Sequence, residues 1–326
     1  MDHPHLAFGV DIGGTKILTA LVDVSSGKVI AHRTVPTRVE AGPVSITKEI
    51  AQIIQELKKA PEVAAQLHRQ PLPVGFAVAG QIDGVNGCVR FAPNLAWRNF
   101  PLRQQFQESL QAPIYVTNDV RAAAWGEWIY GAGRGCQDAV YLFFGTGIGG
   151  AIVSAGKMLT GTSNAAGELG HIVIDRTGPL CTCGNRGCFE ALAGGWAIAR
   201  DLKAAVKAQP AEGKFLLGVV DGKLEELTAK RLFEGYSARD PLSVWFLDEW
   251  VDIVSAAVSG LVNAFNPKKL IFGGGIIAGA PFMVPKIKEE IQKRALAAAV
   301  EPLEVVRSLL GAEAGAIGAA VFAVNN

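Results

Sequence analysis

A cluster of three cysteines and one histidine is the part of the sequence best suited to chemistry. Cys181, Cys183 and Cys188 fall within eight residues, and His171 lies ten positions before the first of them. Three thiolates and one imidazole match the ligand set of a closed, tetrahedral structural zinc site, which leaves no open position for a catalytic water. The sequence therefore predicts a structural Zn²⁺ held by these four side chains.

Clustered cysteines have other known roles. A disulfide is disfavoured, because the chain has the features of a cytosolic protein, where clustered cysteines more often bind metal or act in catalysis. A redox or iron–sulfur role stays open, although three cysteines with a histidine suit zinc better. Gly184 and Gly187 would let the backbone turn tightly enough to bring Cys188 back to the other thiols. The isolated Cys88 and Cys136 are expected to be ordinary buried thiols.

Two carboxylates bracket this cluster. Glu168 precedes His171, and Glu190 follows Cys188. If a metal holds the loop, both carboxylates would be fixed beside it. They could then bind the hydroxyl groups of a polyhydroxy ligand.

Glycine-rich turns follow two apolar strands. Asp11-Ile12-Gly13-Gly14-Thr15-Lys16 lies between strands expected at 6–10 and 17–23, and Gly145-Thr146-Gly147 lies between strands expected at 139–144 and 151–154. Rossmann and Walker loops lead into a helix, so these hairpins belong to neither class. A glycine hairpin can still bring backbone N–H groups close to a phosphate, and Asp11 could hold a hydrated Mg²⁺.

A third glycine run extends this pattern. Gly273, Gly274 and Gly275 follow a strand expected at 269–272. Three glycines after a buried strand favour the close approach of a ligand, such as the face of a nucleoside, over an ordinary loop. Ile12-Gly13-Gly14 and Ile148-Gly149-Gly150 also occupy the same place in two strand–turn–strand units, which indicates two related halves.

The remaining elements position further polar residues. A strand at 114–117 presents Asn118 and Asp119, and a helix at 120–130 follows. Open α/β sheets place chemistry at such strand ends, although a plain helix cap would also explain an isolated Asp. Asn94 to Trp97 is expected to lie in a loop. Periodicity predicts a strand at 74–79, and helices at 45–59 (closing at Pro61), 102–110, 195–208, from about 227, 241–265 and 312–326.

Composition limits the classes of function. The chain has 326 residues, 49% of them hydrophobic, and a formal net charge of +1. This length allows one large or two medium domains, and the charge gives no electrostatic case for a nucleic-acid partner. No apolar stretch reaches the ~20 residues of a membrane span, and no signal-peptide pattern is present at the N-terminus. We therefore expect a cytoplasmic protein with neither nucleic-acid nor membrane partners.

Taken together, the motifs resemble those of the ROK family, and within it the bacterial glucokinase-type sugar kinases. The CxCGxxGCxE segment is highly specific, and the matching segments run in the family's order over nearly the whole chain. These segments are DIGGTK, NLAW, NDV, GTGIGG, GELGH, CTCGNRGCFE, NPKKLIFGGGI and AGAIGAA.

The resemblance implies an actin-like ATPase (ribonuclease H-like) α/β fold, with two related α/β domains around a cleft. It places an N-terminal domain at residues 1–118, with the C-terminal helix at about 312–326 packing back on it. The larger domain, at 119–311, would carry the zinc loop. ATP, Mg²⁺ and structural Zn²⁺ are the implied cofactors, a sugar and a nucleotide the ligands, and a homodimer the assembly.

By the same resemblance, Asp119 is the general base that accepts the proton of the attacking sugar hydroxyl. His171 would use one ring nitrogen for zinc and the other for the sugar. The sugar-binding residues would be Gly80, Asn94, Asn118, Asp119, Glu168, His171 and Glu190. The nucleotide and its metal would be contacted by Asp11, Gly13, Gly14, Thr15, Lys16, Gly145, Thr146, Gly147, Gly273, Gly274 and Gly275.

The implied reaction is phosphorylation of glucose at its 6-hydroxyl by ATP. A fructokinase or a kinase of N-acetylhexosamine or N-acetylmannosamine is the alternative, and another nucleotide or polyphosphate stays open as the donor. Ala79 and Arg121 depart from the family pattern, which usually has Pro and Asn at these positions. A sugar-responsive repressor is disfavoured, because only Met1 to Pro4 precede the first strand, too few residues for a DNA-reading helix.

Overall fold

The computed structural model describes residues 5–60, 63 and 71–326. The chain divides into two compact units. Unit 1 comprises Met1–Gly135, Thr160–Ala166 and Leu309–Asn326, and unit 2 comprises Cys136–Leu159 and Gly167–Ser308. Pro61, the expected end of the first helix, and the segment 1–4 lie outside the described residues. Among the residues that are described, no helix is long and apolar enough to cross a membrane.

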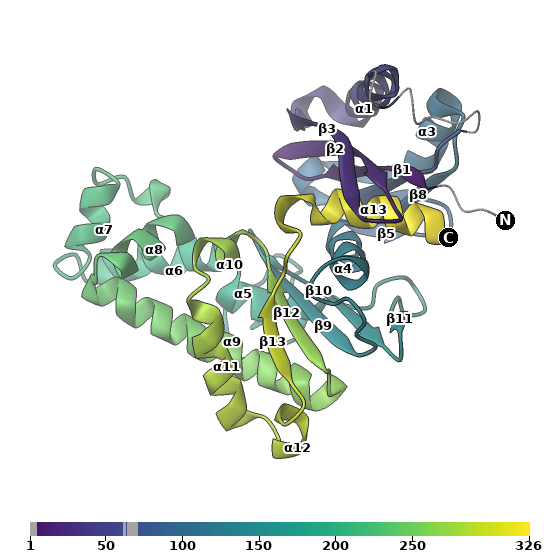
Figure 1. Cartoon of the computed structure of the whole chain (residues 1–326). Coiled ribbons are helices and arrows are strands. Elements are labelled where there is room, and N and C mark those ends of the chain that lie inside the picture. The colour runs from purple at the N-terminus through teal and green to yellow at the C-terminus, as the bar shows by residue number, and fades with distance from the viewer. Residues whose placement is uncertain (1–4, 61–62, 64–70) are drawn as a thin grey trace. The chain divides into compact units, whose positions relative to one another are not determined.

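Unit 1 is built on a five-stranded sheet with the order β3-β2-β1-β4-β8, and a three-stranded sheet, β5-β6-β7, lies in the same unit (Figure 1). Strands β1, β4 and β8 are parallel, whereas β2 and β3 are antiparallel to their neighbours. The strands are β1 (Leu6–Ile12), β2 (Lys16–Asp23), β3 (Lys28–Pro36), β4 (Val74–Val78), β5 (Gln81–Asp83), β6 (Cys88–Ala92), β7 (Trp97–Phe100) and β8 (Ile114–Asn118), and the helices are α1 (Gly42–Lys59), α3 (Leu102–Leu110), α4 (Asp119–Ile129) and α13 (Ala314–Asn325), with 3₁₀ turns η1 (Val39–Ala41), η2 (Pro93–Leu95) and η5 (Gly311–Glu313).

The two faces of this sheet carry side chains of different size. On β1, alternate large residues such as Phe8 and Val10 join the apolar core formed with α1 and α3. The opposite face presents small residues, among them Ala7 and Ala20, to the small-residue helix α13. Alternation along a strand sends successive side chains to opposite faces. The result is a sheet with a thick core on one side and a closely applied helix on the other.

Glycines permit the close approach of α13. Gly9 of β1 and Gly75 of β4 are register partners in adjacent strands. A Cβ at Gly9 would lie 1.8 Å from the carbonyl oxygen of Ala316, and one at Gly75 would lie 1.8 Å from that of Ala319. Any side chain at either position would therefore push the helix off the sheet.

The contact between α13 and α4 is equally close, which gives a test of the packing. A Cβ at Gly318 would lie 1.6 Å from the carbonyl oxygen of Ala122. We expect Gly318→Ala to lower the free energy of unfolding by about 1–3 kcal/mol or more, as overpacking does. Urea denaturation would measure the change. Gly260→Ala is the matched control, because Gly260 is an exposed helical position with nothing near an added Cβ. This substitution should raise the free energy of unfolding by up to ~1 kcal/mol. Equal effects of the two substitutions would contradict this account of the packing.

Unit 2 repeats the strand plan of unit 1. Its sheet has the order β11-β10-β9-β12-β13, in which β9 and β10 form the antiparallel hairpin and β9, β12 and β13 are parallel. The same arrangement of hairpin and parallel neighbours in both sheets confirms the two related halves that the repeated glycine hairpins indicate. The strands are β9 (Ala139–Phe144), β10 (Ile148–Ser154), β11 (Lys157–Met158), β12 (Lys269–Gly273) and β13 (Glu304–Arg307).

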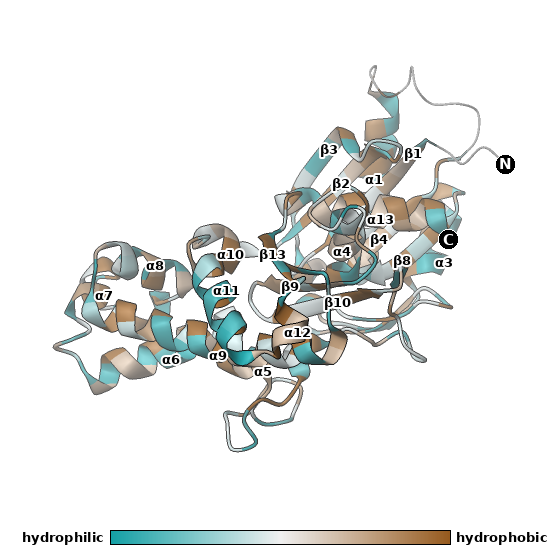
Figure 2. Cartoon of the chain, turned by 60° about the horizontal axis from the view of Figure 1, so that its bottom comes forward, coloured by the Kyte–Doolittle hydropathy of each residue, from teal (hydrophilic) through white to brown (hydrophobic). Residues whose placement is uncertain are grey.

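The helices of unit 2 supply most of its core. Each of α6, α9 and α11 carries both hydrophobic and hydrophilic residues (Figure 2), as expected of helices with one face in a core. Trp250 of α9 is 1% exposed, and its indole N–H donates to the carbonyl of Ala193 at 2.9 Å. The helices are α5 (Phe189–Ala193), α6 (Gly195–Ala208), α7 (Lys214–Val219), α8 (Ala229–Ser237), α9 (Pro241–Phe265), α10 (Gly275–Gly279), α11 (Met283–Arg294) and α12 (Ala297–Val300), with 3₁₀ turns η3 (Leu169–His171) and η4 (Leu224–Glu226).

The structure differs from the sequence predictions in several places. Trp97 does not lie in a loop, because it begins β7 and pairs with Ala92 of β6. The third glycine run is not a plain turn, since Gly275 begins α10. Cys136 is buried as expected, but Cys88 is only half-buried. Helix α4 belongs to unit 1, where it packs on α13, so the units separate after Gly135 rather than at residues 118–119.

Candidate active site

In unit 1, the predicted site residues other than Asn94 lie at or just after the carboxyl ends of three parallel strands, and Asn94 lies in η2. Ile12 of β1 is the register partner of Val78 of β4, which is the partner of Asn118 of β8. The three strands therefore end at one level of the sheet. The residues that follow them are brought to the same edge, where open α/β folds place their ligands.

Asn118 fixes the start of α4 and its first residue. The Asn118 side chain is the helix cap, because its Oδ1 accepts the backbone N–H of Arg121 at 3.1 Å. Its Nδ2 donates to Oδ1 of Asp119 at 3.0 Å and to the carbonyl of Gly80 at 3.1 Å. The cap is thus Asn118 and not Asp119. The Asp119 carboxylate is held by its neighbour instead of being used to cap the helix, as a catalytic base requires.

A second carboxylate, Asp11, lies near Asp119. Burial, and to a lesser extent the negative charge of Asp119, raise the pKa of Asp11 to about 7, although the nearby Lys16 opposes the shift. Its Oδ2 lies 2.5 Å from where a Cβ at Gly315 would stand. Two neighbouring carboxylates in a partly dehydrated site repel one another, and a divalent cation would relieve this repulsion. The donor chemistry at Asp11 therefore fits hydrated Mg²⁺.

The first glycine hairpin contacts the segment that carries Asn94. A Cβ at Gly14 would lie 2.9 Å from Cβ of Asn94, so only glycine fits there. The turn is closed by a bond from the Gly13 N–H to the carbonyl of Lys16 at 3.0 Å. Thr15 and Lys16 are exposed at its tip. Unit 1 thus brings together Asp11, Gly13, Gly14, Thr15, Lys16, Gly80, Asn94, Asn118 and Asp119.

In unit 2, Glu190 joins the second glycine hairpin to the segment after the cysteines. Its Oε2 accepts the backbone N–H of Ile148 at 2.9 Å, and its Oε1 accepts the indole N–H of Trp196 at 3.3 Å. A Cβ at Gly147 would lie 2.1 Å from Oε2 of Glu190, which explains the glycine. Because each carboxylate oxygen has a second lone pair, Glu190 can still accept a hydrogen bond from a ligand.

A cavity of about 1240 Å³ opens beside this hairpin within unit 2. Of the predicted nucleotide-binding glycines, Gly145 and Gly275 line it with Thr146, and nothing stands within 4 Å of an added Cβ at either glycine. Gly147, Gly273 and Gly274 are not among the lining residues. Gly274 has φ +87° and lies against the Phe144 backbone. Sequence reasoning missed the other walls, which are Gly195, Trp196, Thr228, Ala229, Lys230, Phe233, Glu234, Ser237, Ala238, Ile276 and Gly279.

The wall formed by α8 and α10 has the character of a small-molecule site. Phe233, Ala229 and Ile276 offer apolar surface, while Glu234 and Ser237 add a few polar groups. Ligand sites are commonly apolar pockets with a small number of placed polar groups. The start of α10 belongs to the third glycine run, whereas α8 carries no recognisable motif and only its helical periodicity was visible in the sequence.

The four predicted metal ligands are brought together. The Sγ atoms of Cys181, Cys183 and Cys188 and a ring nitrogen of His171 lie within 4.8 Å of one another. Sγ of Cys183 is 3.7 Å from Sγ of Cys188, and Sγ of Cys181 is 3.7 Å from Nδ1 of His171. In a tetrahedral site with Zn–S bonds of about 2.3 Å, neighbouring ligand atoms stand about 3.5–3.8 Å apart. The residues therefore fit zinc, and all five cysteines of the chain are free thiols.

Local backbone geometry builds this cluster. Gly184 has φ +92° and Gly187 has φ +65°, both in the left-handed region that favours glycine. Without a cation, burial and the neighbouring thiols raise the pKa of the Cys188 thiol to about 12. Three thiolates this close need a positive charge, which a bound metal supplies.

Two of the residues predicted to bind the sugar, Glu168 and His171, belong to the segment that carries the cluster. With Nδ1 of His171 directed at the thiols, its Nε2 is the ring nitrogen left for a ligand. Glu168 is exposed immediately before η3, whose Gly170 packs against β10 so closely that a Cβ would lie 2.0 Å from the carbonyl oxygen of Ile148. Unit 2 thus holds Glu168, His171 and Glu190 around one metal-binding segment.

The repeated sheet plan, the glycine hairpin in each unit and the carboxylates at the strand ends define a mixed α/β protein of the actin-like ATPase fold. The sequence model of the ROK family matches residues 7–326. The chain belongs to the ROK family.

Relatives and solved structures agree with this assignment. The chain is 36% identical to a glucokinase of Thermotoga maritima, over 96% of this chain and 95% of the relative. It matches the crystal structure of a ROK family glucokinase from Streptomyces griseus in complex with glucose and AMPPNP with a TM-score of 0.83, at 33% identity and covering 98% and 100% of the two chains. It is also 28% identical to a xylose repressor of Caldicellulosiruptor bescii, over 98% of this chain and 78% of that protein.

Proposed function

We propose that this protein is an ATP-dependent hexose kinase that phosphorylates glucose at the 6-hydroxyl. The observation that carries the proposal is the Asp119 carboxylate, which Asn118 holds at the aligned ends of three parallel strands. The likeness to glucokinases along nearly the whole chain supports the same activity.

Asp119 would act as the general base. It would accept the proton of the sugar hydroxyl while that oxygen attacks the γ-phosphoryl group of ATP, and ADP would leave. Asn118 orients the carboxylate by donating a hydrogen bond to its Oδ1. The reaction needs few other reactive groups from the protein, because phosphoryl transfer depends mainly on positioning and charge stabilisation.

The other side chains would bind and orient. Asp11 would hold the magnesium ion, which when bound neutralises charge on the phosphates. Asn94, Glu168, Glu190 and Nε2 of His171 would accept or donate hydrogen bonds with the sugar. Both amide atoms of Asn118 already have partners within the protein, so its role would be chiefly to hold the base. Phosphate contacts are assigned to Gly13, Gly14, Thr15, Lys16, Gly145, Thr146 and Gly147, and nucleoside contacts to Gly273, Gly274 and Gly275.

We further assign the protein to the cytoplasm, to carbohydrate metabolism through glycolysis, and to a homodimer. The zinc ion would be structural, since its four ligands come from the protein and leave no open position. These assignments rest on the family resemblance together with the Cys/His cluster of unit 2.

A sugar panel tests the activity. ADP release should be measured with glucose, mannose, fructose, N-acetylglucosamine and N-acetylmannosamine at matched concentrations. We expect the highest kcat/KM for glucose. Higher values for fructose or an N-acetylated sugar would establish the alternative kinase, and specific binding to operator DNA without turnover on any sugar would establish a repressor instead.

A further inference from the structure

A buried arginine that takes no part in the proposed chemistry lies close to the base in sequence. Arg121 is the third residue of α4 and is 5% exposed. Its Nη1 donates to Oδ1 of Asn164 at 2.6 Å, and its Nη2 donates to the carbonyls of Asn164 and Ala166, each at 3.1 Å. Burying a guanidinium is costly unless its N–H groups are paired. These contacts therefore fasten the segment Thr160–Ala166, which we call the strap, to α4.

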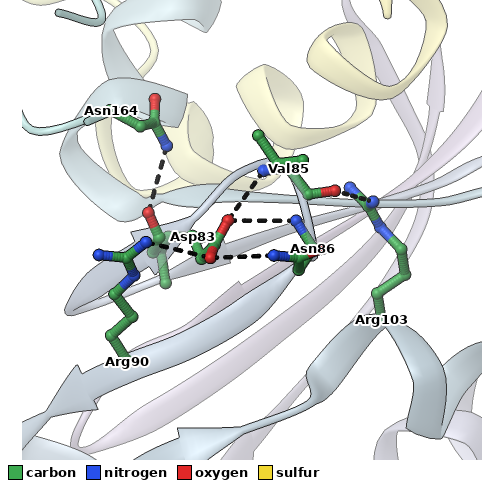
Figure 3. A network of polar contacts seen from close by, with 7 residues as sticks. Asp83, Val85, Asn86, Arg90, Arg103 and Asn164 are labelled. Atoms are coloured by element: carbon green, nitrogen blue, oxygen red, sulfur yellow. Dashed lines mark hydrogen bonds and ion pairs between the residues drawn. The ribbon is translucent and has the colours of Figure 1, made fainter. Parts of the chain in front are cut away.

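The strap is fastened at a second point. Nδ2 of Asn164 donates to the carbonyl of Ile82 in β5 at 3.3 Å, and Asn164 itself has φ +60°. Figure 3 shows the Asn164 side chain with its bond toward the strand that carries Asp83, and it shows Arg103 bound to the following turn at Val85. The Ala166 N–H closes the strap on itself by donating to the carbonyl of Thr160 at 3.0 Å. Arg121 and β5 thus hold the same residue from two sides.

The strap leads directly into a proposed sugar-binding segment. Ala166, whose carbonyl accepts a bond from Arg121, is followed by Gly167 with φ +91° and then by the exposed Glu168. The backbone N–H of Arg121 also donates to Asn118, which holds the base.

We propose that Arg121 is a positioning residue for sugar binding, which acts by fixing the strap and through it the approach of Glu168. This role rests on the proposed kinase function. A guanidinium carries the forked N–H donors that can reach two carbonyls and a side-chain oxygen together, which a shorter amide lacks.

Loosening the strap should affect sugar binding more than chemistry. In the variant, the strap must be ordered when the sugar binds, and this adds an entropic cost to binding. Asp119 keeps its own bond from Asn118, so the chemical step is unaffected. We expect Arg121→Met to raise the KM for glucose about 10-fold while kcat stays within about 3-fold, the pattern of lost ground-state binding. The KM for ATP should not change.

Two variants and one physical measurement make the test sharp. Asn164→Gly removes the side-chain bonds of Asn164 to Arg121 and to the carbonyl of Ile82, keeps the two backbone carbonyls that Arg121 also contacts, and tolerates the positive φ. The Arg121→Met and Asn164→Gly effects on the glucose KM should therefore be non-additive in the double variant. Hydrogen exchange of the 160–168 backbone should be faster in both variants than in the unchanged protein when no sugar is bound.

The matched control is Arg33→Met. Arg33 is an arginine of β3 in unit 1, and its guanidinium pairs with Glu56 of α1 and with no residue of the strap. In this control variant, the glucose KM should stay within about 2-fold of that of the unchanged protein, because a bond lost elsewhere adds no ordering cost to sugar binding. An unchanged glucose KM in an active Arg121→Met protein, or the same rise in the Arg33 control, would refute the positioning role alone. If Arg121→Met does not fold, Asn164→Gly decides the same question. Absence of glucose phosphorylation by the unchanged protein would refute the kinase function. The exchange measurement would still show whether Arg121 orders the strap.

Discussion

Asp119→Asn is expected to lower kcat by about 10²–10⁴-fold, the usual contribution of a general base. The amide has the shape of the carboxylate, and its oxygen can still accept the bond from Nδ2 of Asn118, so the start of α4 should be preserved. An amide nitrogen cannot take up the proton of the sugar hydroxyl. Glucose affinity, measured by calorimetry, should stay within about 3-fold, because the ground-state contacts are kept.

The control for this substitution is Asp23→Asn. Asp23 is a carboxylate of unit 1 at the end of β2, where it accepts bonds from Ser25 and Ser26 and takes no part in the proposed site. Its turnover should match that of the unchanged protein. Retained turnover in Asp119→Asn, or loss of glucose binding with turnover kept, would show that Asp119 is not the base.

Cys188→Ser should release the metal and disable the sugar-binding segment. The native protein should contain about one zinc per chain, and the variant much less, because a hydroxyl is a poor zinc ligand compared with a thiolate. Cys188 immediately precedes α5, which carries Glu190, and its strand bridge to Val173 joins the loop to the segment after His171. The glucose KM should therefore rise, and kcat/KM should fall by about 10–100-fold, as with other lost metal-site supports.

Cys136→Ser separates this effect from the loss of any buried thiol. Cys136 is buried in unit 2, and its thiol donates to the carbonyl of Asp138 away from the cluster. It should keep both the zinc content and the activity of the unchanged protein. Metal analysis of fully active native protein that finds no zinc would remove the metal from the account.

Much of the fold was accessible from the sequence because its signals are local. Apolar strands that end in glycine or in Asn118-Asp119 predicted β1, β4, β8 and β9, and the helix expected at 241–265 is α9 with the same bounds. The cysteine spacing predicted the metal cluster directly, since positive-φ glycines at 184 and 187 permit only a compact loop.

The remainder depends on contacts between distant segments. Nothing local shows that Trp97 begins a strand, because β7 is stabilised by pairing with β6. The α8 wall of the cavity has ordinary helical periodicity, and the Arg121 bonds to Asn164 join residues 43 positions apart. Asn118, not Asp119, caps α4, a choice that depends on side-chain geometry. Such features follow from tertiary packing, which local propensity does not determine.

The most direct test of the central claim is the stoichiometry of the reaction. The native protein should be incubated with glucose, ATP and Mg²⁺, and glucose 6-phosphate and ADP should be quantified in the same samples. We expect one glucose 6-phosphate for each ADP, with neither product above background in Asp119→Asn. ADP formed without glucose 6-phosphate, or no product at all from zinc-loaded native protein, would contradict it.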